Sequence, residues 1–212
     1  MLIKNVIELN WLLKKLGEAY PEKTVVLRHD NPFQLLVAVM LSAQCTDARV
    51  NLVTNKLFKT YSGPKDFIEA SQKEIENEIY STGFYKNKTK NIRAASKLIL
   101  EKYSGRVPNT MQDLLTLPGV ARKTANIVLS SAFGKTEGIA VDTHVFRLSK
   151  RLGLSKAKIP EKTEVDLMQL IPKEKWSSFS LQLIAHGRRV CVARKPKCSE
   201  CFLQAKCPKI IA

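Results

Sequence analysis

Apolar residues along the chain recur mainly with the spacing of α-helices. In the segment 122–133, Ala125, Val128, Leu129, Ala132 and Phe133 follow the i, i+3, i+4, i+7, i+8 pattern of one helix face. Alternating apolar and polar runs, which are typical of half-buried strands, are scarce. The pattern therefore predicts an all-α protein.

The most apolar helix is predicted over residues 32–43. Asn31 is a suitable N-cap and Pro32 a suitable first helical residue. The segment is apolar nearly all round, so we expect a buried, central helix. It is interrupted at residues 44–47, where Thr46 or Asp47 can cap a second helix that reaches about Tyr61.

Capping and breaking residues indicate the remaining helices. Ser71 and Glu74 form a capping-box signature, and Gly134 is suited to end the helix that closes at Phe133. Asp142 can cap a helix that ends before Gly153. Further helices are expected from about residue 72 to 80 and over 86–102, 111–117, 122–133, 163–170 and 176–188.

The charge balance favours a polyanionic partner. The 212 residues, enough for one or two compact units, include 35 Lys+Arg against 19 Asp+Glu, a formal net charge of +16. Basic residues gather in the runs 86–106, 147–162 and 186–197. One such run is typical of a solvated helix face, but three together favour a shared anion, with nucleic acid ahead of an acidic membrane surface or protein.

Targeting and membrane signals are absent from the sequence. No basic segment followed by an apolar one is found at the start, and the longest apolar run, 35–41, is too short to span a bilayer. We therefore expect a monomeric, cytoplasmic protein, associated with the nucleoid if the source is bacterial.

Four of the five cysteines are clustered in the last 22 residues. Cys191, Cys198, Cys201 and Cys207 have the spacing C-x6-C-x2-C-x5-C. Thiolates suit zinc or an iron–sulfur cluster. Four ligands on one compact loop favour the larger iron–sulfur cluster, and zinc is the alternative. Cys45 lies apart and is interpreted as a small buried hydrophobe.

Residues 117–124 predict an anion site between two helices. Leu117 to Ala121 form a tight turn, and Arg122 and Thr124 lie in the first turn of the next helix. Backbone N–H groups and the helix dipole attract an anion there, and a DNA phosphate fits. An ordinary turn broken by Pro and Gly is the alternative.

Lys123 and Asp142 are the candidate catalytic residues. The helix dipole and Arg122 disfavour a charged amine at Lys123, which makes it a candidate nucleophile for Schiff-base chemistry. An exposed lysine that contacts phosphate is the alternative. Asp142 is either a plain N-cap or a carboxylate that moves protons or stabilises a cation. His144 is interpreted as structural or phosphate-contacting.

Six segments together resemble the endonuclease III family of base-excision DNA glycosylases. They are LSAQCTD (41–47), TGFYKNK (82–88), LPGVARKTANIVL (117–129), VDTHVFR (141–147), HGR (186–188) and the four-cysteine loop. The last three in this order are highly specific. The resemblance covers nearly the whole chain.

The resemblance implies two helical lobes with a DNA groove between them. One is a six-helix barrel with a helix–hairpin–helix, expected over 23–135, and the other joins 1–22 to 136–212 and carries a 4Fe–4S cluster. The implied activity is a bifunctional DNA glycosylase/AP lyase that removes oxidised pyrimidines from duplex DNA and cleaves abasic sites by β-elimination through a lysine Schiff base.

The resemblance also assigns residues to roles. Lys123 is the nucleophile, Asp142 the catalytic aspartate, and the four clustered cysteines the cluster ligands. Gln44 and Phe84 fill the space left in the duplex by the extruded nucleotide. The other implied DNA contacts are Leu117, Gly119, Ala121, Arg122, Thr124, Thr143 and His144.

Three positions depart from the family pattern. Ala121 replaces a glycine, and if that position needs a positive φ the change costs about 1 kcal/mol. Cys45 replaces a small alanine, which should be tolerated. Phe84 stands where leucine is common, and its ring could stack on a base.

Related and unrelated functions compete with this interpretation. Adenine glycosylases that act on mispairs share the cluster and hairpin but generally lack a lysine at position 123. The 8-oxoguanine glycosylases have the lysine but generally lack the four-cysteine loop. A non-enzymatic DNA-binding or redox-sensing protein with zinc or an iron–sulfur cluster is the alternative from another class.

Overall fold

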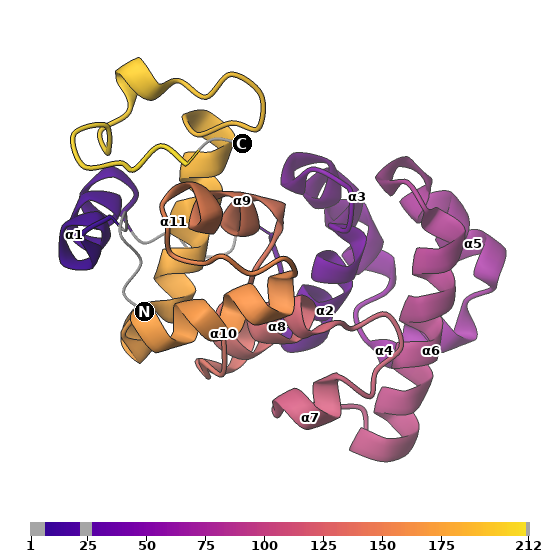
Figure 1. The fold of residues 1–212 in the computed structure, drawn as a ribbon. Helices are drawn as coiled ribbons and strands as arrows, with labels where there is room; N and C mark the ends of the chain where they lie inside the picture. The colour runs from indigo at the N-terminus through magenta and orange to yellow at the C-terminus, as the bar shows by residue number, and fades with distance from the viewer. Residues whose placement is uncertain (1–6, 22–26, 211–212) are drawn as a thin grey trace. The chain divides into compact units, whose positions relative to one another are not determined.

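The computed structural model describes residues 7–21 and 27–210, and these residues contain helices and no strand (Figure 1). The predicted all-α class is confirmed. The helices are α1 (Leu9–Ala19), α2 (Pro32–Leu41), α3 (Asp47–Thr60), α4 (Pro64–Glu69), α5 (Gln72–Ile79), α6 (Tyr85–Tyr103), α7 (Met111–Leu114), α8 (Arg122–Phe133), α9 (Thr143–Arg151), α10 (Pro160–Leu170) and α11 (Trp176–Arg189), with short 3₁₀ turns at Tyr80–Thr82, Lys173–Lys175 and Cys198–Glu200.

The chain divides into two compact units, each with its own apolar core. One unit is built from the ranges 1–24 and 138–212, and the other from 25–137. Among the described residues, no helix is long and apolar enough to cross a membrane.

Helix α2 forms the centre of the 25–137 unit. Every residue from Phe33 to Leu41 is buried, so this helix needs cover on all sides. Helices α3, α6 and α8 pack against it. At its start the Asn31 side chain accepts a hydrogen bond from the backbone N–H of Gln34 at 2.9 Å, as the N-cap motif predicts.

Helix α4 packs against α6 in the same unit, and a side chain of α6 ends it. Arg93 donates hydrogen bonds to the carbonyl oxygens of Phe67 and Ala70, which lie at the end of α4. Asp66 accepts hydrogen bonds from the backbone N–H groups of Ser62 and Gly63 just before the helix. These contacts order a helix of only six residues.

Helices α1, α9, α10 and α11 form the other unit. Their core includes Leu12 and Leu16 of α1, Leu148 of α9 and Phe179 of α11, all fully buried. Helix α11 contacts both α1 and α9 (Figure 1). It therefore joins the N-terminal helix to the C-terminal part of the chain.

The largest differences from the predicted helices are in four places. Helices α1 and α4 were not predicted, because α1 has no side-chain cap and α4 is too short to show a period. Helix α10 begins at Pro160, three residues early. Helix α7 ends at Leu114, because the N–H of Leu117 turns back to the Leu114 carbonyl at 3.1 Å.

Candidate active site and cluster loop

The turn between α7 and α8 is tight and requires glycine at one position. Gly119 has φ +77, a backbone conformation that side chains disfavour. A Cβ atom there would lie 2.8 Å from Cβ of Asn91 on α6. The N–H of Val120 donates to the carbonyl of Leu117 at 3.1 Å and closes the turn. The hairpin is thus packed against α6 by backbone rather than side chain.

Ala121 does not carry the strain that a positive φ would impose. Its φ of −89 and ψ of 168 are extended, and it is the N-cap of α8. Alanine adopts these angles freely. The departure from the family's second glycine therefore leaves the hairpin backbone unstrained.

From the geometry of the hairpin we expect two substitutions to differ in their effect on stability. Gly119→Ala should lower the free energy of unfolding by about 1–3 kcal/mol, because it adds left-handed strain and a clash with Asn91. Ala121→Gly should change it by less than about 0.5 kcal/mol, since glycine is an acceptable N-cap. Urea denaturation measures both. Equal effects would contradict the turn geometry.

Lys123 is the second residue of α8, and its side chain is exposed. Ala125, Val128 and Leu129 of the same helix are buried, and α8 packs against α2. The apolar face fixes the rotation of α8, so its first turn presents Lys123 to solvent next to the hairpin. Arg122 lies exposed beside it, and Thr124 is half-buried.

Asp142 is the N-cap of α9, in the other unit. Its Oδ1 accepts hydrogen bonds from the backbone N–H groups of His144 and Val145, both at 2.8 Å. The capping role is therefore present, and it uses one carboxylate oxygen. The side chain is half-buried and Thr143 is exposed. Nδ1 of His144 lies 3.2 Å from a guanidinium nitrogen of Arg147, which gives His144 a structural contact.

Gln44 and Phe84 share an unusual backbone conformation. Their φ angles are 54 and 49, in the left-handed region, where a residue with a side chain pays about 1–2 kcal/mol. Gln44 is exposed in the turn after α2, and the Phe84 side chain is 64% exposed at the N-cap of α6. Strain of this kind persists where neighbouring structure holds it, and it is frequent at functional sites.

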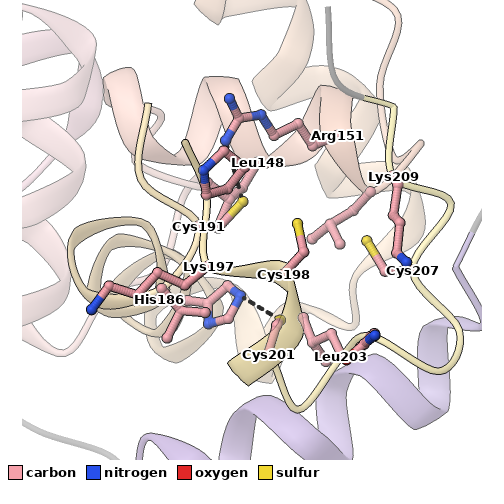
Figure 2. Close-up of a pocket in the computed structure, with 14 residues that line it drawn as sticks. Leu148, Arg151, His186, Cys191, Lys197, Cys198, Cys201, Leu203, Cys207 and Lys209 are labelled. Carbon is pink, nitrogen blue, oxygen red and sulfur yellow. Dashed lines mark hydrogen bonds between the residues drawn. The ribbon is translucent and has the colours of Figure 1, made fainter. Parts of the chain in front are cut away.

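The four clustered cysteines line one hollow (Figure 2). Its cavity volume is about 30 Å³, and its walls include Leu148, Leu152 and Leu203. Within the described residues, no group of three or more His, Cys, Asp or Glu side chains is gathered closely enough to hold one metal ion. Four thiols around a hollow suit a cluster, which spans more space than a single zinc ion.

Burial affects the thiols that face this hollow. It raises the pKa of Cys201 and of Cys207, and the neighbouring thiols raise both further. Coordination to a metal would offset this cost, because it stabilises the thiolate form.

Two arginines of α9 fasten the first part of the cysteine loop. Arg151 donates to the carbonyl oxygens of Val192 at 2.8 Å and Ala193 at 2.9 Å, and its Nη1 lies 3.4 Å from Sγ of Cys191. Arg147 donates to the carbonyl of Cys191 at 3.0 Å. These two arginines of the basic run 147–162 therefore stabilise the fold by binding backbone carbonyls and do not form part of a solvated helix face.

His186 was not singled out by sequence as a site residue, yet it contacts the cysteine loop. It is 2% exposed, with Nδ1 3.1 Å from the hydroxyl of Tyr20 and Nε2 3.5 Å from Sγ of Cys201 (Figure 2). Burial lowers its pKa to about 4, so the ring is neutral near pH 7. The signals available in the sequence were the segment HGR (186–188) and its place five residues before Cys191.

The cysteine loop should lose its cluster when Arg151 is replaced. Arg151→Met leaves the carbonyls of Val192 and Ala193 without their donor, so we expect less iron and sulfide per chain after purification. Arg194→Met, at an exposed position of the same loop, is the matched control and should keep the full content. Equal cluster content in the two variants would show that the arginine contacts are dispensable.

Family comparisons define the class of this fold. Residues 37–173 match the HhH-GPD superfamily of base excision DNA repair proteins, and residues 191–207 match the iron–sulfur binding domain of endonuclease III. The chain is 55% identical to endonuclease III of Synechocystis sp. over 95% of its own length and 90% of that protein, and 48% identical to that of Bacillus subtilis over 96% and 93%.

Solved structures agree with the sequence matches. An endonuclease III in a non-covalent complex with DNA superposes with a TM-score of 0.89 at 46% identity, covering 93% of this chain and 92% of that one. The chain belongs to the endonuclease III family. It carries a 4Fe–4S cluster, which residues 191–207 bind.

Proposed function

We propose that the protein is a bifunctional DNA glycosylase/AP lyase of base excision repair, acting on oxidised pyrimidines and abasic sites in duplex DNA. The observation that carries the proposal is the exposed Lys123 amine in the first turn of α8, directly after the hairpin 117–121. A trapped covalent complex with DNA is known for an endonuclease III that is 46% identical to this chain. Lysine is the residue type that forms such an adduct as a Schiff base.

Binding to the duplex precedes the chemistry and reads no sequence. The net charge of +16 supplies salt-dependent attraction to phosphates. We assign a phosphate contact to the hairpin and the start of α8, because the first turn of a helix combines backbone N–H donors with the positive end of the helix dipole. The contacting residues are Leu117, Gly119, Ala121, Arg122 and Thr124, with Thr143 and His144 at the start of α9.

The damaged nucleotide leaves the stack before it reacts. Neutral Lys123 attacks C1′ of its sugar through Nζ, a C–N bond forms, and the C1′–base bond breaks with the electron pair leaving on the base. Nζ then loses a proton, and the C1′–O4′ bond breaks with its electron pair and a proton going to O4′, which gives the protonated Schiff base. Removal of a C2′ proton then expels the 3′ phosphate by β-elimination.

Asp142 supplies the carboxylate of the reaction. One oxygen caps α9, and the carboxylate takes part in the reaction by accepting a proton or by stabilising positive charge on the sugar. Gln44 and Phe84 occupy the space in the duplex that the extruded nucleotide leaves. Their exposure and their fixed, strained backbone suit side chains that enter a base stack.

The four cysteines 191, 198, 201 and 207 hold the 4Fe–4S cluster. When bound, the cluster would join four points of the loop and so add to the stability that the packing of Leu203 in the core provides. We further propose that the protein acts as a monomer in the cytoplasm, where chromosomal DNA is accessible if the source is bacterial.

Borohydride trapping tests the assignment of Lys123. The wild-type protein should form a covalent adduct with a duplex that carries thymine glycol or an abasic site, because the reductant converts the Schiff base to a stable amine. Lys123→Gln should form none, while Lys56→Gln, at an exposed position of α3, should trap as fully as the wild type. Full trapping by Lys123→Gln would rule out Lys123 as the nucleophile.

Two substitutions separate the chemical role of Asp142 from its capping role. Asn can still accept the capping hydrogen bonds, so Asp142→Asn should keep the free energy of unfolding and lower single-turnover excision by ~100-fold or more. Asp142→Ala should show the same kinetic loss and cost about 1 kcal/mol of stability as well. Normal excision by the Asn variant would mean that Asp142 is only a cap.

A further inference from the structure

One side chain contacts both segments that lead to Gln44 and Phe84. The Lys88 ammonium donates hydrogen bonds to the carbonyl oxygens of Leu41 at 2.7 Å and Thr82 at 2.8 Å. Lys88 is only 6% exposed, although it lies in a strongly basic helix whose other lysines are mostly exposed. It therefore does not offer its charge to a DNA phosphate.

The two accepting carbonyls lie where each segment begins. Leu41 is the last residue of α2, three residues before Gln44, and Thr82 ends the 3₁₀ turn two residues before Phe84. The last carbonyls of a helix have no partner within the helix, and a cation is favoured at that end by the dipole. Lys88 supplies both a hydrogen-bond donor and a positive charge at these positions. It also bridges two parts of the chain that are 41 residues apart in sequence.

Burying a charged ammonium group at this position costs free energy. Burial disfavours its charged form and lowers the pKa of Lys88, and the nearby Cys45 side chain acts in the opposite sense. An apolar side chain would avoid that cost but would leave two buried carbonyls without a donor. The lysine thus fixes the relative positions of the two carbonyls. It thereby fixes the positions of the two backbone segments that lead to Gln44 and Phe84.

We propose that Lys88 is a positioning residue that holds the Gln44 and Phe84 side chains in a fixed relation for insertion into the duplex. The inference rests on the proposed function of these two side chains as space-filling residues. Lys88 itself touches neither the substrate nor the reacting atoms. It acts through the two backbone segments that it joins.

The test compares Lys88→Met with Lys86→Met, an exposed lysine two residues earlier on α6. The dissociation constant is measured for an undamaged duplex and for a duplex with a tetrahydrofuran abasic analogue opposite 2-aminopurine. Lys88→Met should reduce the preference for the abasic duplex about tenfold and lower the 2-aminopurine fluorescence at saturation, because the inserted side chains no longer keep the opposite base unstacked.

Lys86→Met should weaken binding to both duplexes equally and leave the preference unchanged. The ratio of the two dissociation constants does not depend on how much of the sample is folded, so loss of stability alone does not move it. Lys88→Gln, which keeps one donor, provides a second variant if Lys88→Met folds poorly, and it should change the ratio in the same direction. An unchanged ratio in the folded fraction of either variant would overturn the proposal.

Combined variants separate this inference from the proposed function. If Lys88 acts through the two inserted side chains, Lys88→Met should change the ratio little when Gln44 and Phe84 are already alanine. If the Gln44→Ala, Phe84→Ala protein keeps the wild-type ratio and fluorescence, the proposed insertion role itself fails. If that protein loses them and Lys88→Met does not, only the role of Lys88 is refuted.

Discussion

Complete burial of α2 is the constraint on which the unit of residues 25–137 depends. A helix that is apolar all round must be covered on every side, and α3, α6 and α8 provide this cover. The covering helices reach solvent at their ends. The residues to which we assign DNA contacts or chemistry lie at or next to helix ends: Gln44 between α2 and α3, Phe84 before α6, and Lys123 at the start of α8.

In the other unit, helix α9 connects the carboxylate to the cluster loop. Asp142 caps its first turn, and Arg151 at its last residue holds the backbone of Val192 and Ala193. Nine residues of helix separate the two ends by only about 14 Å. Arg147 contacts both His144 and the Cys191 carbonyl, so the order of the cysteine loop bears directly on the turn that positions Asp142.

The positive charge divides between the surface and the interior. Lys88, Arg93, Arg147 and Arg151 donate to backbone carbonyls at the ends of helices and in the cysteine loop. Long cationic side chains can satisfy several carbonyls at once, which short polar side chains cannot. The net charge therefore identifies the class of partner but overstates the charge that faces DNA.

By itself the sequence determined the local features: the caps at Asn31, at Thr46 or Asp47, and at Asp142, the tight turn of the hairpin, and the cysteine spacing. These depend on neighbours within a few residues, so periodicity and capping patterns reveal them. The resemblance of six short segments added the family and its chemistry. Only the tertiary structure decided that Lys88 joins Leu41 to Thr82, that Arg151 holds the carbonyl of Val192, 41 residues further along the chain, and that Ala121 is unstrained. These depend on which helix ends meet after the core is packed, and no local pattern contains that information.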